Sequence, residues 1–114
     1  MRRPATTVLL ALALALVTEQ SAAVVGIRGA VSCGTWLKGR GAGESNRHQT
    51  WLVAFLSGLA AGRDMDFWGQ PGVNILENES VYLWMDNYCR NNPLKDMDDG
   101  AESLFWERIR MNRK

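Results

Sequence analysis

Two cysteines, Cys33 and Cys89, restrict the folds that this 114-residue chain can adopt. In an exported protein an even number of cysteines is most simply explained by disulfide bonds, and two cysteines allow a single intramolecular pairing. A bridge that closes so long a loop contributes roughly 4 kcal/mol in the chain-entropy description, against about 5–10 kcal/mol of total stability for a domain of this size. The sequence therefore predicts a domain whose folding depends on a Cys33–Cys89 disulfide.

Two other uses of the cysteines fit the sequence less well. Two thiolates cannot complete a structural zinc site without His or carboxylate partners, and the chain contains no CxxC spacing. A reactive thiol pair has no supporting motif. We therefore expect neither a metal site nor a cofactor.

The N-terminus predicts export. Two arginines precede the apolar run Val8–Val17, and the small residues Ser21-Ala22-Ala23 follow it, as at a signal-peptide cleavage site. The run of ten residues is too short to cross a bilayer of about 30 Å, so an uncleaved membrane anchor is the less favoured alternative. We expect a signal peptide over residues 1–23 and one mature domain over 24–114, periplasmic or secreted and free of the membrane.

The charge balance excludes several classes of partner. The chain has 13 Lys plus Arg and 12 Asp plus Glu, and removing residues 1–23 takes away two arginines and one glutamate, which leaves 11 charges of each sign. A net charge of zero argues against broad attachment to nucleic acid or anionic membranes. The local run of basic residues at the C-terminus is expected to be a solvated helix end; it comprises Arg108, Arg110, Arg113 and Lys114.

Apolar residues recur at spacings of three and four along most of the mature chain, which predicts amphipathic helices. No segment alternates with a period of two, so the predicted fold class is all-α. We expect a small four-helix domain, with helices over 33–38, from 45 to about 61, from a cap at Asn78 or Ser80 to about 91, and from Leu94 onward. The apolar face of the last helix is expected to comprise Leu94, Met97, Ala101, Leu104, Phe105 and Ile109.

Glycine and proline mark the expected connections. The three glycines within Gly39–Gly43 predict a loop, because glycine carries a large backbone entropy. Gly62 is the expected left-handed stop of the second helix, and Pro71-Gly72 predicts a turn in the long connection that follows. Gly100 costs the last helix about 1 kcal/mol, so that helix is expected to begin as late as Asp99.

No residue pattern indicates catalysis. The only histidine, His48, lies in the first turn of the long helix and is typical of a solvated surface group. Ser57 lies inside a helix rather than on a nucleophile elbow. The segment from Asp96 resembles a calcium loop, but Ala101 stands where that loop requires glycine. A pair of carboxylates acting as general acid and base is left as an alternative, but the sequence singles out no such pair. An enzyme is therefore the less favoured class of protein.

Aromatic residues supply the candidate binding sites. Most of the five tryptophans are expected in the core, because a small domain needs a large apolar area per residue. Trp84 and Trp106 lie off the main apolar stripes, so they either widen the core or face a partner or a second subunit. Phe67 and Trp68, in the long connection, either fold back onto the core as a lid or contact a partner.

Three segments resemble the small periplasmic acid-stress chaperones of the HdeA/HdeB type: Ser32-Cys33-Gly34-Thr35-Trp36-Leu37, then residues 51–58 (WLVAFLSG), then residues 85–93 (MDNYCRNNP). The shared pattern is a signal peptide, a cysteine opening the first helix, an apolar long helix, a second cysteine ending the third helix, and a charged terminal helix. It covers nearly the whole mature chain. The glycine-rich segment, the long aromatic connection and the additional tryptophans depart from the family.

The resemblance implies a compact helical domain tied by Cys33–Cys89. It also implies a homodimer at neutral pH that opens in acid and exposes apolar surface to unfolded client proteins. The charge count allows this mechanism, because protonating 11 carboxylates and charging His48 takes the mature chain from zero to about +12. Self-repulsion then loosens the fold while the disulfide limits unfolding.

A second resemblance implies a different partner. Tai-type immunity proteins of type VI secretion are similar in size, export, helical content and the Cys-near-Trp opening of Cys33 and Trp36. They plug the active site of one toxin, so the resemblance implies one periplasmic toxin or enzyme as partner and the Phe67-Trp68 loop as the contact. An envelope protein of another role is the third alternative.

Overall fold

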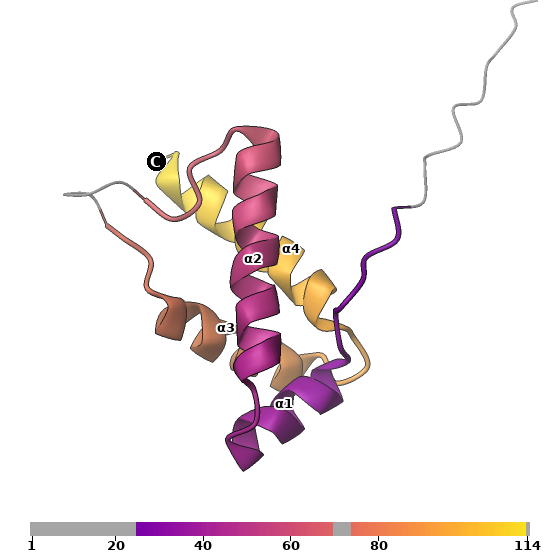
Figure 1. Ribbon diagram of the computed structural model, residues 1–114. Coiled ribbons are helices and arrows are strands. Elements are labelled where there is room, and N and C mark those ends of the chain that lie inside the picture. The colour runs from indigo at the N-terminus through magenta and orange to yellow at the C-terminus, as the bar shows by residue number, and fades with distance from the viewer. Residues whose placement is uncertain (1–24, 70–73, 114) are drawn as a thin grey trace, which may run out of the picture.

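The computed structural model describes residues 25–69 and 74–113, which form four helices (Figure 1). The helices are α1 (Cys33–Ala42), α2 (Asn46–Arg63), α3 (Asn78–Asn91) and α4 (Met97–Asn112). Helix α1 packs on α3, α2 on α4, and α3 on α4. The predicted all-α, four-helix fold is confirmed, whereas the predicted signal peptide lies outside the described residues.

The predicted disulfide is present and staples α1 to α3. Cys33 is the first residue of α1 and Cys89 lies near the end of α3; their Cα atoms are 4.8 Å apart and both side chains are fully buried. The backbone N–H of Cys33 donates to Lys95 O at 2.9 Å, and that of Met97 donates to Val31 O at 2.9 Å. Three helices therefore meet at the bridge.

Helix α4 supplies the largest share of the core. Its buried apolar residues are those predicted from periodicity: Met97, Ala101, Leu104, Phe105 and Ile109. Leu94, expected on the same face, precedes the helix and is 98% exposed, so that expectation is wrong. The helix begins between the two expected positions because Asp96 is its N-cap, and the Asp99 carboxylate accepts the Asp96 N–H at 3.2 Å.

Gly100 is buried where α4 crosses α3. A Cβ atom at this position would lie 2.7 Å from both the Met85 sulfur and Tyr88 Cδ1. The residue that weakens α4 by propensity thus permits its close approach to α3.

Helix α1 extends through the segment that was expected to be a loop. It ends only at Gly43, which adopts a φ of +71° and donates its N–H to Arg40 O at 3.4 Å, while Glu44 N–H donates to Gly39 O at 2.9 Å. These two bonds form a Schellman cap. The loop prediction for residues 39–43 is wrong because tertiary contacts of this turn, described below, offset the weak helix propensity of glycine.

The end of α2 differs from expectation. Helix α2 passes Gly62 and ends at Arg63, and Asp64 takes the left-handed position with a φ of +51°; the short Asp side chain tolerates this conformation. Helix α3 runs from Asn78 to Asn91, close to its expected bounds, but Glu77 rather than Asn78 or Ser80 takes the N-cap position.

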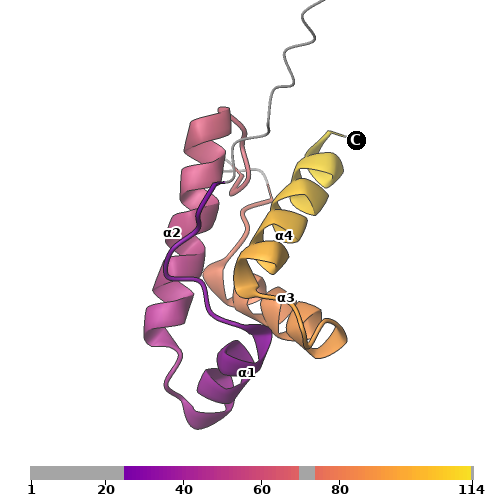
Figure 2. The same cartoon turned by 90° about the vertical axis from the view of Figure 1, so that its right-hand side faces the viewer.

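Residues 25–32 run from α2 to the start of α1 (Figure 2). They are fixed on α2 by the Trp51 indole, whose Nε1 donates to Arg28 O at 2.7 Å. Gly29, with a φ of +86°, lies over this indole, where a Cβ atom would come within 2.6 Å of the ring. In the described part of the chain, no helix is long and apolar enough to cross a membrane.

Candidate functional site

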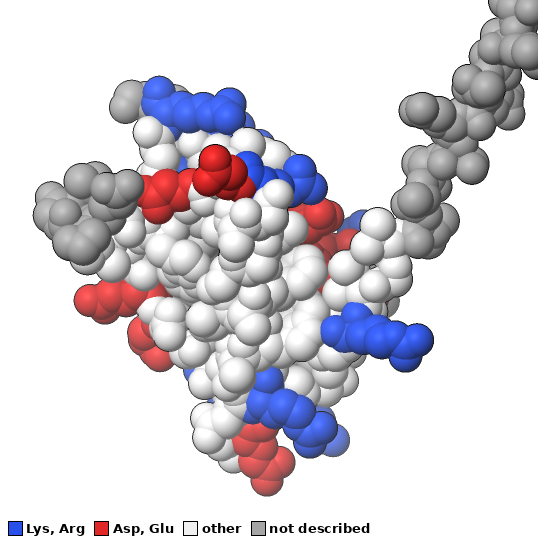
Figure 3. Space-filling model, turned by 45° about the horizontal axis from the view of Figure 1, so that its top comes forward, with Lys and Arg blue, Asp and Glu red and all other residues white. Residues whose placement is uncertain are grey.

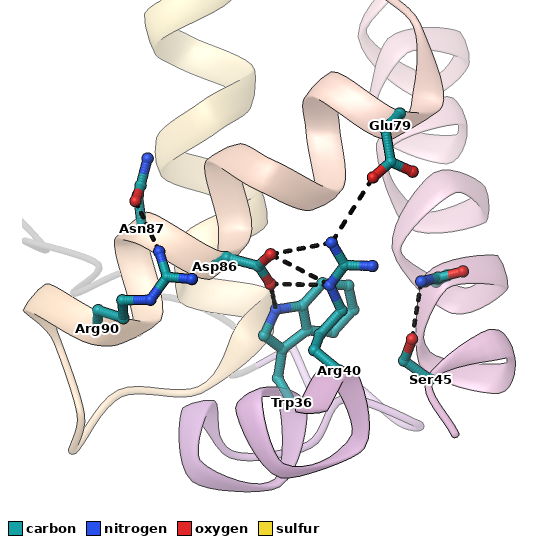
Figure 4. A network of polar contacts seen from close by, with 8 residues as sticks. Trp36, Arg40, Ser45, Glu79, Asp86, Asn87 and Arg90 are labelled. Carbon is teal, nitrogen blue, oxygen red and sulfur yellow. Dashed lines mark hydrogen bonds and ion pairs between the residues drawn. The ribbon is translucent and has the colours of Figure 1, made fainter. Parts of the chain in front are cut away.

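A cluster of polar contacts joins α1 to α3 (Figure 4). Asp86 of α3 is only 5% exposed. Its carboxylate accepts hydrogen bonds from Trp36 Nε1 at 2.8 Å, from Arg40 Nε at 3.0 and 3.1 Å, and from Arg40 Nη2 at 3.0 Å. We call Trp36, Arg40 and Asp86 the α1–α3 cluster.

Arg40 is held from several sides. Its guanidinium carbon lies 6.0 Å from the ring centre of Trp36 and 5.8 Å from that of Tyr82, and Nη2 is 3.8 Å from Glu79 Oε1. Hydrogen bonding to Asp86 raises the pKa of Arg40 above its ordinary value, against the opposing effect of burial. Because Arg40 lies in the last turns of α1, this pairing explains why the helix continues through the glycines.

The cluster is a structural pin between α1 and α3. All of its hydrogen bonds end on the carboxylate of Asp86, which holds both α1 side chains. Sequence reasoning missed Asp86, although a signal was present: it lies four residues after Tyr82 and three before Cys89, on the apolar face of α3. A carboxylate on such a face needs a buried partner.

Arg108 is a buried cation, not part of a solvated helix end as predicted. It is 8% exposed and donates from Nε to Phe67 O at 3.2 Å and from Nη2 to Asn74 O. Asn112 Nδ2 donates to Asp66 O at 3.1 Å. The connection between α2 and α3 is therefore clamped to α4. Spacing could have placed Arg108 on the apolar stripe, since it follows Leu104 by four residues.

The two loop aromatics take different positions. Phe67 is fully buried and stacks on Phe105 with ring centres 5.6 Å apart, so it acts as the lid and has no surface for a partner. Trp68 is half-buried: its ring meets the Phe67 ring edge-on at 4.8 Å, and Nε1 donates to Ser57 Oγ at 3.1 Å. Of the two, Trp68 remains a candidate contact.

Trp68 forms one wall of a shallow groove of about 470 Å³ beside the C-terminal half of α2. We call it the Trp68 groove; its other lining residues are Ser57, Ala60, Ala61, Asp64, Met65 and Asp66. Asp66 also holds the loop, because its Oδ1 accepts the Gly69 N–H at 2.9 Å.

Trp84 and Trp106 are half-buried and each connects two helices. Trp84 of α3 stacks on Tyr88 at 5.4 Å and donates from Nε1 to Glu107 Oε2 of α4 at 3.2 Å. Trp106 of α4 lies 4.9 Å beneath the guanidinium of Arg63 of α2. Both therefore contribute to helix packing, and their contact with a partner stays a prediction.

Two remaining polar features have local explanations. Asp96, Asp98 and Asp99 lie close together, but the cap of α4 uses Asp96 and Asp99. His48 is half-buried rather than solvated, because its ring lies against α1 near Gly39; its Nδ1 is enclosed and has no hydrogen-bond partner among the described residues.

Comparison of the chain with models of known protein families, with curated proteins and with solved structures finds no match. The class that the fold itself defines is a small helical domain with one disulfide, pinned by a partly buried ion pair. The resemblances to acid-stress chaperones and immunity proteins stay predictions that depend on sequence segments.

Proposed function

We propose that this protein is an exported acid-stress chaperone that binds unfolded client proteins through apolar surface uncovered at low pH. The observation that carries the proposal is the α1–α3 cluster. Helices α1 and α3 are joined by one tie that acid does not break, Cys33–Cys89, and by one that depends on the charge of Asp86.

The second tie is electrostatic. Arg40 Nη2 lies 3.0 Å from Asp86 Oδ2 and 3.8 Å from Glu79 Oε1, so two carboxylates face one partly buried guanidinium. In strongly acidic solution carboxylates as a class are protonated while Lys and Arg stay charged, and the total charge of the mature chain rises to about +12. Pairing between carboxylates and cations weakens under these conditions, whereas the disulfide persists.

In the proposed opening, the surface uncovered is the one between α1 and α3. Separation of α1 from α3 would expose the indole of Trp36, which is fully buried, and more of the Tyr82 ring that lies 6.4 Å from it. The disulfide keeps the ends of the two helices together, so the chain loosens without unfolding completely. An apolar surface on a tethered chain is suited to binding unfolded proteins.

The test compares neutral and acidic solution. Gel filtration and client-aggregation assays at about pH 2–3 and pH 7 should show dissociation of the expected homodimer and suppression of client aggregation only in acid. A dimer that persists in acid and leaves clients unprotected would contradict the proposal.

A second candidate function is a Tai-type inhibitor of one periplasmic toxin or enzyme. The clamped loop favours it, because Arg108 and Asn112 fix the segment that carries Trp68, and preorganised aromatic residues are effective binding anchors. Stable one-to-one capture of a cell-wall amidase at neutral pH would support this function, and absence of any such complex would count against it.

A further inference from the structure

Trp68 is presented in one fixed orientation on the folded protein. Its indole nitrogen is bonded to Ser57 of α2, its ring rests on Phe67, and its carbonyl accepts the N–H of Leu76 at 2.9 Å. Trp68 also lines the Trp68 groove. A half-buried indole that is already immobilised loses little entropy when it binds a partner.

The groove has charges of one sign only. Asp64 and Asp66 are its ionisable lining residues, and both are exposed. Arg63, although adjacent in sequence, lies over Trp106 of α4 instead. The neighbouring face of α2 carries no charge between His48 and Arg63, and Figure 3 shows a broad uncharged surface over this helix with charged groups around its edge.

The remaining lining is apolar or small. Ala60 and Ala61 form a low surface along α2, and Met65 lies beside them. Such a surface accommodates aliphatic groups, while an indole face beside carboxylates favours a cation. The fold contains contacts between a cation and an indole elsewhere, since Arg63 lies 4.9 Å from the Trp106 ring centre and Arg40, which pairs with Asp86, lies 6.0 Å from that of Trp36.

We propose that the Trp68 groove is the docking site for a segment of a partner protein in which Arg or Lys adjoins an aliphatic side chain. The cation lies between the indole of Trp68 and the carboxylates of Asp64 and Asp66, and the aliphatic group covers Ala60 and Ala61. This inference rests on the second candidate function, and it is independent of the acid-stress function.

The test uses folded, disulfide-bonded protein at neutral pH and short acetylated, amidated peptides of alternating Leu and Arg. Nuclear magnetic resonance should show shifts of the Trp68 indole N–H and of the backbone amides of Ala60, Ala61 and Met65. A peptide of alternating Leu and Glu should bind at least about tenfold more weakly, and added salt should weaken the Leu/Arg peptide.

Variants separate docking from folding. The double variant Asp64→Asn with Asp66→Asn removes the charge of the groove. Asn tolerates the left-handed conformation at position 64, and its side-chain oxygen still accepts the Gly69 N–H at position 66. The variant should therefore lower the affinity for the Leu/Arg peptide severalfold. The control, Glu44→Gln with Glu102→Gln, removes the same charge outside the groove and should leave affinity unchanged. Equal binding of the Leu/Glu peptide, shifts centred elsewhere, or an unaffected Asp64/Asp66 variant would overturn the inference.

The capture experiment distinguishes the two proposals. If an amidase is captured equally by the wild type and by the Asp64/Asp66 variant, the inhibitor function stands and the docking inference fails. If no amidase is captured while the Leu/Arg peptide binds at Trp68 as described, the docking inference stands and the partner is a different protein.

Discussion

Arg108 donates a hydrogen bond of 3.2 Å to the carbonyl oxygen of Phe67, so a buried cation on the last helix holds the loop that closes over the core. The same guanidinium reaches Asn74 O, on the returning side of the connection. A residue that the sequence suggested was solvated is thus a main link between the α2–α3 connection and α4.

Replacing Arg108 by Met should lower the free energy of unfolding by about 1–3 kcal/mol, because the carbonyl of buried Phe67 and the carbonyl of Asn74 both lose their donor. Urea unfolding followed by far-ultraviolet circular dichroism measures this change. The matched control is Arg110→Met, an exposed site on the same helix, for which we expect a change within about 0.5 kcal/mol. Equal losses for the two variants would refute the clamp.

Two glycine substitutions should have opposite signs. Gly58→Ala, in the middle of α2, meets no atom within 4 Å and should stabilise the protein by about 0.5–1 kcal/mol through helix propensity. Gly100→Ala places its Cβ 2.7 Å from the Tyr88 ring and should destabilise it despite the same propensity gain. Thermal unfolding of both variants checks this, and a stabilising Gly100→Ala would show that α3 and α4 do not need a glycine there.

Asp64→Gly should raise stability by about 0.5–1 kcal/mol, because Asp64 is the non-glycine residue with a positive φ in the described segments. Asp66→Gly should lower stability instead, since it removes the acceptor of the Gly69 N–H. Chemical denaturation of the pair measures the difference. If both variants are destabilised equally, the left-handed cap of α2 carries no conformational cost.

Alkaline solution should destabilise the fold partly through Tyr88. Burial, followed by the negative charge of Asp99, raises the pKa of Tyr88 above its ordinary value near 10. The unfolded chain therefore loses this proton first, and stability falls as pH rises from about 10 through the folded-state pKa. Tyr88→Phe should show a smaller fall between about pH 9 and pH 11 in urea unfolding. An unchanged pH profile would assign the loss to other groups.

The parts of the fold that depend on local pattern could be predicted from the sequence. The periodicity of Met97, Ala101, Leu104, Phe105 and Ile109 identified the buried face of α4, and the cysteine count identified the disulfide. Both signals can be read from a single sequence, because the first arises from burial of one face of a helix and the second from covalent pairing of two cysteines.

Features that depend on contacts between distant residues could not be predicted in the same way. The helical state of residues 39–42 depends on Arg40 meeting Asp86, which lies 46 positions away. Phe67 is a core residue because it meets Phe105, and only the fold brings their rings together. Local propensity takes no account of either contact. It therefore favoured a loop at residues 39–42 and left two alternatives for Phe67.

Client protection as a function of pH, measured for the wild type and for Asp86→Asn, tests the proposed function most directly. Asn has a similar shape to Asp but carries no charge, so the Asp86→Asn variant should suppress client aggregation at a higher pH than the wild type. The control variant Asp98→Asn lies outside the cluster and should behave as the wild type does. If the wild type gives no protection in acid, or if Asp86→Asn leaves the onset pH unchanged, Asp86 does not control a chaperone surface.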